Sequence, residues 1–356
     1  MAEQKKWKEQ EERGAGQGRS GWVPEGGETG HAWRGRMNKK TARGSKHESL
    51  DGLDPRSGTS TRGSPLSANR EPANDLRPWF ARLVAARIET DDDHKIVCGM
   101  CNDLAYQRIV QRGRWTALSK DGDGVYKDEA LLFGPHSRYM PLTCTGPVVA
   151  IGVGLRPGAL ARLTAHSMPD MVDRIVRGDP LGLVETNMAE EYPASGTPQD
   201  WNVRMEERLR ALIKRLDPEP PDPVSTAFEH AAFMDPNIAP GDVAEEQGIS
   251  LRQLERIVKR DFGMSPKKVL RRARALDLAA QLCGVADENE EQELLLRYFD
   301  QSHLIREFQA FFANTPAAFR STPHPLMTIT LETRQARRLE ELKRIAPGEK
   351  RPWEAQ

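Results

Sequence analysis

Hydrophobic and polar positions divide the chain into a strand-like middle and a helical C-terminal part. From residue 95 to residue 155 the apolar residues come in short bursts, interrupted by Gly, Pro, Asp and charged residues. Short apolar runs at this spacing are typical of the strands of an antiparallel sandwich or barrel. We therefore predict strands at 96–101, 104–110, 131–133, 139–144 and 148–155.

Helical periodicity flanks these strands. The segment 76–87 has the pattern of a short helix, and two further short helices are predicted between residues 160 and 175. Residues 201–216 form one amphipathic helix, because apolar side chains recur there at steps of three and four. This helix either packs on its own domain or forms the seam of a dimer. Four prolines between residues 218 and 223 then mark a stiff linker.

The C-terminal part contains the pattern of a helix-turn-helix unit. Between residues 238 and 262 two short helices are predicted, joined by a tight turn. Gly248 lies where this turn requires a positive φ, which glycine adopts without strain. Ser250 is a good N-cap for the second helix, and Gln253 three residues later completes a capping box.

A second copy of this pattern follows at 294–308, with a longer helix at 266–282 between the two copies. At these residues the sequence resembles the DNA-binding domain of the AraC family. The strings that carry the resemblance are SLRQLER at 250–256, GMSP at 263–266, DQSHLIREF at 300–308 and TPAAFR at 315–320. The resemblance covers roughly residues 225–322.

The resemblance implies two helix-turn-helix units that place helices in successive major-groove segments of promoter DNA, about 34 Å apart. Position by position, it implies that the side chains reading bases are Arg252, Glu255 and Arg256 in the first unit and Gln301, Ser302, His303 and Arg306 in the second. The chemistry agrees, because Arg pairs with guanine, Gln pairs with adenine, and Glu accepts from cytosine.

Charge supports this interpretation locally. The whole chain has 52 basic and 52 acidic residues, so its net charge favours no partner. Residues 252–274, however, contain nine basic side chains and two acidic ones, which suits contacts to DNA phosphates. The candidates for phosphate contacts are Lys259, Arg260, Lys267, Lys268, Arg271 and Arg272. The acidic run at 287–293 is expected to form a loop that faces away from DNA.

Composition sets the remaining boundaries. Among the first 70 residues only 14 are apolar and 12 are glycine, so residues 1–72 are expected to be a disordered tail. This tail is a solvated segment, an upstream extension of a protein whose natural start is nearer Met37, or a weak basic arm for DNA phosphates. The predicted chain is an α+β multidomain protein. Its further parts are a β-rich sensor or dimerisation domain at 73–200, a helix and linker at 201–222, an all-α domain with two helix-turn-helix units at 223–322 and a charged tail at 323–356.

The β-rich segment carries weaker signals of chemistry. Cys98 and Cys101 have the spacing of half a zinc site or of a redox pair. Small apolar residues on a strand explain the two cysteines as well. His136 lies either at a ligand mouth or on a surface loop, and Arg156 either binds an anion or makes a structural ion pair.

The resemblance to the AraC family implies a transcription regulator that binds promoter DNA and responds to an unknown small-molecule effector through its β-rich domain. Motifs such as GxSxG and HExxH are missing, so we expect neither an enzyme nor a cofactor. RNA polymerase and a second copy of the chain, as a homodimer, are the further partners. No apolar run reaches the roughly 18 residues of a membrane span, so we expect a cytoplasmic protein without a membrane partner. The alternative is an enzyme or a metal or thiol sensor in 73–200, with the helical block as a targeting or protein-interaction module.

Overall fold

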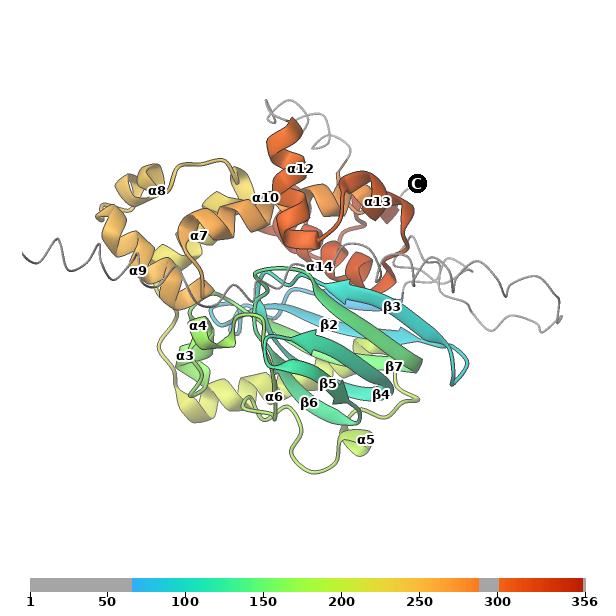
Figure 1. The fold of residues 1–356 in the computed structure, drawn as a ribbon. Helices are drawn as coiled ribbons and strands as arrows, with labels where there is room; N and C mark the ends of the chain where they lie inside the picture. The colour runs from blue at the N-terminus through green and yellow to red at the C-terminus, as the bar shows by residue number, and fades with distance from the viewer. Residues whose placement is uncertain (1–65, 288–300, 355–356) are drawn as a thin grey trace, which may run out of the picture. The chain divides into compact units, whose positions relative to one another are not determined.

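The computed structural model describes residues 66–287 and 301–354, with the backbone alone at 301–304. A β-rich part, residues 67–177, precedes a mainly helical part (Figure 1). Most of the tail expected at 1–72 lies outside the described residues. Its last residues are described, and the first strand already begins at Ser67, so the β-rich part includes residues before the predicted boundary at 73.

The β-rich part is one antiparallel sheet of eight strands in the order β1-β2-β7-β4-β6-β8, with β3 paired to β7 and β5 paired to β4. The strands are β1 (Ser67–Arg70), β2 (Phe80–Ile88), β3 (Lys95–Met100), β4 (Ala105–Ser119), β5 (Gly122–Tyr126), β6 (Glu129–Phe133), β7 (Met140–Leu155) and β8 (Ile175–Arg177). The long strands β4 and β7 pair with different neighbours along their two halves. Their register shifts on either side of Arg112, and Gly113 beside it has φ 88°. A Cβ there would lie 2.9 Å from the Pro147 carbonyl oxygen, so the bend requires glycine.

The predicted strands are confirmed, with 139–144 and 148–155 joined into the single strand β7. The predicted helix at 76–87 is wrong, because most of this segment is strand β2. Side chains on both faces of β2 are buried, so its apolar run is continuous instead of alternating. Such a run cannot be distinguished from a buried helix by periodicity. The second short helix is also shorter than predicted, and Ile175 begins strand β8.

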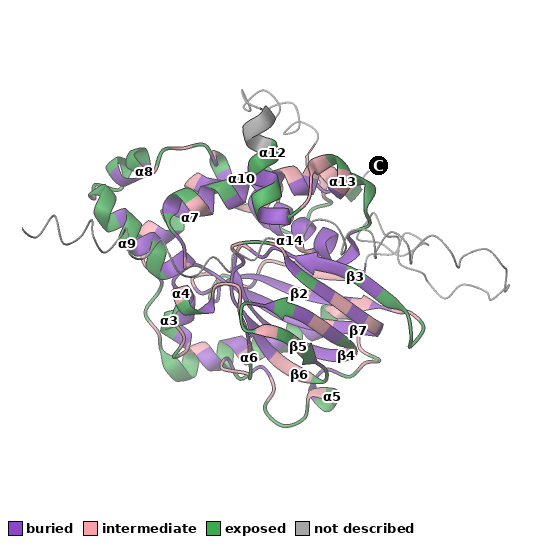
Figure 2. Cartoon of the chain, viewed as in Figure 1, coloured by how far each residue is buried: buried purple, intermediate pink, exposed green. Residues whose placement is uncertain are grey.

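Helices cover both faces of the sheet (Figures 1 and 2). Helix α6 (Pro198–Leu216) packs through Leu209 and neighbouring side chains on the face that carries Leu83. Helix α14 (Pro325–Glu341) packs through Ile329 on the opposite face, which carries Ile96. Of the two interpretations of the amphipathic helix, packing on its own domain is therefore the observed one.

The remaining helices divide between the two parts. Helices α3 (Ala159–Leu163) and α4 (Met168–Met171) belong to the β-rich part, and α5 (Met188–Glu191) follows its last strand. The helical part contains α7 (Pro223–Met234), α8 (Pro240–Glu246), α9 (Leu251–Phe262), α10 (Pro266–Leu282), α12 (Gln301–Phe312) and α13 (Pro316–Ser321), and the short 3-10 helix Pro352–Glu354 follows α14. None of the helices within the described ranges is both long and apolar enough to cross a membrane.

The segment 323–356 is not the solvated charged tail that its composition predicts. Helix α14 is buried along nearly its whole length, including the side chains of Arg334, Arg337 and Arg338. Burial of these charges is tolerated because carboxylates and carbonyls from other elements meet them. Since those partners lie far away in the sequence, composition could not reveal them.

The packing of α6 predicts that Leu209→Ala lowers the free energy of unfolding by about 2–5 kcal/mol, because Leu209 is fully buried against the sheet. Leu216 on the same helix is 43% exposed, so Leu216→Ala should have little effect. Urea denaturation of both variants measures the difference. Equal losses, or a change of oligomeric state caused by Leu209→Ala alone, would contradict this packing.

Candidate DNA-binding surface

Helices α8 and α9 form the predicted helix-turn-helix. Gly248 in the connecting turn has φ 65°, as expected. The capping box at the start of α9 is complete: the Gln253 N–H donates to Ser250 Oγ at 3.3 Å, and the Ser250 N–H donates to Gln253 Oε1 at 2.9 Å. The local sequence thus fixes both the turn and the first residue of the second helix.

One face of α9 belongs to the core. Leu254, Val258 and Phe262 are buried on this face, and the ring of Phe262 meets the ring of Phe228 from α7 edge to face at 5.4 Å. Val243 of α8 packs into the same cluster. This packing fixes the rotation of α9 about its axis and turns its polar face outward (Figure 2).

The outward face of α9 carries the candidates of the first unit. Arg252, Glu255, Arg256 and Lys259 are all exposed and, with Ser250 and Gln253, line a shallow hollow. None of these four charged side chains makes an ion pair within the part of the chain that the structure describes. Their donors and acceptors are therefore available to a ligand that approaches this face.

Only part of the second unit can be compared with its prediction. The backbone of Gln301, Ser302 and His303 lies in the first turn of α12, but their side chains are outside the described residues. Arg306 lies one turn further along and is exposed. The helix expected before α12 and most of the acidic run at 287–293 also lie outside the described residues.

The buried face of α12 is well defined. Phe308 stacks on Phe312 at 4.5 Å and meets Phe319 of α13 edge to face at 5.3 Å. The buried carboxylate of Glu307 accepts from Arg271 and Arg274 of α10 at 2.8 Å each. Aromatic packing and these ion pairs hold α12 against α10.

The phosphate candidates fall into different environments. Lys267 is exposed and Lys268 half-buried in the first turn of α10. Arg260 is about half-exposed and pairs with Asp261 and Asp222, and Arg271 pairs with Glu307. These ion pairs orient the two arginines but leave part of each guanidinium open to solvent.

The assignment of Arg272 as a phosphate contact is wrong. This side chain is 2% exposed, and it donates to the carbonyl oxygens of His136 at 3.0 Å and of Asp103 at 2.8 Å. Arg272 therefore docks α10 onto the β-rich part. It follows Val269 by three residues and precedes Leu276 by four, so helical periodicity places it on the buried stripe.

Arginines of α14 extend this contact between the two parts. Arg337 Nη1 lies 3.0 Å from Glu229 Oε1 of α7, and its Nη2 lies 3.2 Å from Asp103 Oδ2 of the loop before β4. Arg334 pairs with the same Asp103 and with Asp277 of α10. Burial raises the pKa of Asp103, but the neighbouring arginines outweigh burial and leave the pKa below its usual value. The carboxylate is therefore held ionised.

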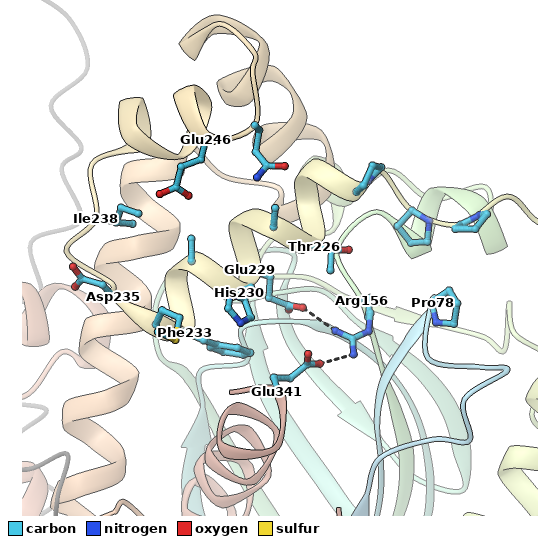
Figure 3. A pocket seen from close by; sticks show the side chains of 17 residues that line it. Pro78, Arg156, Thr226, Glu229, His230, Phe233, Asp235, Ile238, Glu246 and Glu341 are labelled. Atoms are coloured by element: carbon cyan, nitrogen blue, oxygen red, sulfur yellow. Dashed lines mark hydrogen bonds and ion pairs between the residues drawn. The ribbon is translucent and has the colours of Figure 1, made fainter. Parts of the chain in front are cut away.

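Arg156 belongs to the same network (Figure 3). Its Nη1 pairs with Glu229 at 3.1 Å, its Nη2 pairs with Glu341, and its Nε donates to the Arg77 carbonyl at 2.7 Å. An open cleft is lined by Arg156, Glu229, Glu341 and His230. The charge of Arg156 is already neutralised by the two carboxylates. Of the two interpretations of Arg156, the structural ion pair is the observed one.

The other groups singled out in the β-rich part are buried. Cys98 Sγ accepts from the Met327 N–H at 3.4 Å, and burial raises the pKa of Cys101 to about 12. No group of three or more His, Cys, Asp or Glu side chains in the described ranges could hold a metal ion. His136 is fully buried, so it lies neither at a ligand mouth nor on a surface loop; burial lowers its pKa to about 4.

Two segments of the chain match known families. Residues 243–322 match a family described as a helix-turn-helix domain. They form an AraC-type helix-turn-helix domain. Residues 69–177, nearly the whole sheet, match a domain of unknown function (DUF6597). The AraC-type domain supports the function of a DNA-binding transcription regulator.

The solved structures that match this chain are distant in sequence. ToxT from Vibrio cholerae O395 is 8% identical, with a TM-score of 0.41 over 68% of this chain and 98% of its own. Wild-type ToxT from Vibrio cholerae with a bound unsaturated fatty acid is also 8% identical, with a TM-score of 0.39 over 68% and 95%. The AraC-like transcriptional activator CuxR is 13% identical, with a TM-score of 0.24 over 72% and 92%. No curated protein shows a significant sequence match to this chain.

The contact between the two parts predicts a large cost for Arg337→Met. Arg337 is 3% exposed and bridges Asp103 and Glu229. Its loss removes a positively charged partner from both carboxylates, which should lower the free energy of unfolding by about 3–5 kcal/mol. Arg162→Met is the control, because Arg162 pairs with Glu219 on the surface and should change stability by about 0–1 kcal/mol. Denaturant unfolding compares the two variants, and equal costs would refute the role of Arg337.

Proposed function

We propose that this regulator reads two adjacent major-groove segments of promoter DNA, under the control of a small-molecule effector bound by the β-rich part. The observation that carries the proposal is the exposed face of α9. There a capped second helix of a helix-turn-helix presents Arg252, Glu255, Arg256 and Lys259 without ion-pair partners among the described residues. Unpaired arginines on such a face suit base edges and phosphates.

In the first segment, Arg252 and Arg256 would pair with guanine, and Glu255 would accept from cytosine. Lys259, one turn further along α9, would contact a phosphate. Lys267 and Lys268 would add phosphate contacts from the first turn of α10, where the helix dipole favours anions. Arg260 and Arg271 would contact phosphates only through the parts of their side chains that ion pairs leave exposed.

The second segment would be read by α12, through Gln301, Ser302, His303 and Arg306. The ion pairs of Glu307 with α10 support this arrangement, because a rigid connection between α9 and α12 is needed to match one turn of DNA. RNA polymerase and a homodimer partner remain part of the proposal. The apolar face of α6 already packs on the sheet of its own chain, so a second copy would need a different surface. A function on promoter DNA implies a cytoplasmic protein.

Control by an effector requires contact between the β-rich part and the DNA-binding helices. Gly263, directly after α9, has φ 75°, and a Cβ there would lie 2.5 Å from Val172 Cγ2 and 3.0 Å from the Met168 carbonyl oxygen. The end of α9 therefore packs closely on α4. An effector that favours one arrangement of this contact would shift the DNA-binding equilibrium by its difference in affinity.

The proposal predicts that Arg256→Ala loses discrimination between a site selected from random DNA and a scrambled duplex. Loss of a guanine contact should cost about 1–3 kcal/mol on the selected site and little on the scrambled one. Arg204→Ala, an exposed arginine on α6, is the matched control and should leave both affinities unchanged. Equal weakening of both duplexes by Arg256→Ala would remove it from the base-reading set.

Lys259→Ala should instead weaken binding to all duplexes. If Lys259 neutralises one phosphate, the slope of log affinity against log salt should become shallower by about 0.9. Titrations at several salt concentrations measure the slope for wild type and variant. Binding that is independent of salt would contradict DNA binding altogether and favour a protein-interaction module.

A further inference from the structure

A small cavity lies between the sheet and helix α14. The floor comes from β2, β4 and β7, with Val84 and Ala150 among its apolar side chains, and α14 covers it with Leu326, Ile329 and Thr333. The cavity volume is about 60 Å³, enough for a few water molecules. It is thus a mostly apolar space between the sheet and α14, the helix whose arginines pair with the helical part.

Among the residues that the structure describes, Arg108 of β4 is the one charged side chain that lines this cavity. The rings of Tyr106 and Phe133 lie 4.8 and 4.9 Å from its guanidinium carbon and cover the faces of the group. The edges, where its N–H groups point, have weak partners: Met100 Sδ at 2.9 Å and Asn102 Oδ1 at 3.4 Å. Among the described residues no carboxylate pairs with Arg108.

Three buried arginines differ in this respect from Arg108, which is half-buried. Arg82 pairs with Glu340, and Arg334 and Arg337 each pair with two carboxylates. Burial lowers the pKa of Arg108 to about 10, which still leaves it charged at neutral pH. A charged guanidinium in an apolar site without a counter-ion is costly, and that cost disappears when an anion binds.

Trp115 gives a second, independent indication. Trp115 also lines the cavity, and its indole Nε1 is buried and has no hydrogen-bond partner in the described part of the chain. An indole N–H can only donate, so a ligand that satisfies it must supply an acceptor. The guanidinium of Arg108 and the indole of Trp115 can both only donate hydrogen bonds, and the remaining walls of the cavity are mostly apolar.

We infer that this cavity binds a small apolar monocarboxylic acid, whose carboxylate pairs with Arg108 and whose apolar part lies between the sheet and α14. A carboxylate matches the planar guanidinium with two parallel hydrogen bonds. The inference rests on the proposed function only in naming this ligand as the effector.

Ligand binding is coupled to DNA binding because the cavity is smaller than the ligand. A molecule of several carbon atoms exceeds about 60 Å³, so its entry moves α14 outward from the sheet. Arg334 and Arg337 on the same helix pair with α7, α10 and the loop before β4. Binding at Arg108 therefore changes the contact between the sheet and the helix-turn-helix part, and DNA and ligand affect each other's affinity equally.

Titration calorimetry of the full chain with octanoate and with 1-octanol tests the inference, because the two probes share chain length and differ in charge. The wild type should bind octanoate saturably and at least tenfold more tightly than 1-octanol. Arg108→Gln should remove this preference, and Arg108→Lys should restore part of it. Arg177→Gln is the matched control, because Arg177 also lies over a ring of the sheet, that of Tyr126, but outside the cavity.

Equal affinity of the wild type for both probes, or no saturable binding of octanoate, would overturn the inference without reference to any variant. A full preference retained in a folded Arg108→Gln protein would overturn it too. Failure of the proposed function is separate, since it shows as no selective DNA binding by the ligand-free or octanoate-treated chain. Selective DNA binding without octanoate binding would contradict the ligand inference and leave the proposed DNA-binding function intact.

Discussion

Two buried arginines of α14, Arg334 and Arg337, join the sheet to the helix-turn-helix part. Each pairs with Asp103 of the β-rich part and with a carboxylate of the helical part, Asp277 of α10 or Glu229 of α7. Buried charges are costly unless all of them are paired, so such a network tolerates few alternative arrangements. The C-terminal helix is therefore the element on which the arrangement of the rest depends.

Helix α14 both covers the cavity on the sheet and carries the arginines that pair with the helical part. Residues 326–333 of α14 cover the cavity, and Arg334 and Arg337 follow on the next turns. A second contact, of Gly263 with α4, ties the end of α9 to the same β-rich part. A displacement of α14 thus reaches the candidate DNA surface through packed, charged contacts and not through a flexible linker.

The helix-turn-helix could be predicted from the sequence because its determinants are local. Gly248, Ser250 and Gln253 act within a few residues of one another, and the structure confirms the turn and the capping box. The strand β2 was mistaken for a helix because both of its faces are buried. Arg272 has the charge of a phosphate contact, but helical periodicity places its side chain on the buried stripe of α10.

Features that depend on distant residues were beyond prediction. The burial of α14 rests on carboxylates more than 50 residues away, such as Asp277, and the isolation of Arg108 is visible only when its neighbours in space are known. No pattern along the chain separates Arg108 from Arg112 or Arg114 on the same strand. The sequence thus predicts the candidate DNA surface better than the candidate ligand site.

The central claim is that two recognition helices on one rigid body read one face of DNA. Selection of binders from a random duplex pool by the full chain, near physiological salt, tests this claim most directly. The account predicts a single enriched motif with two boxes whose centres are about 10 base pairs apart. A motif with one box, or no enrichment by the folded protein, would contradict it.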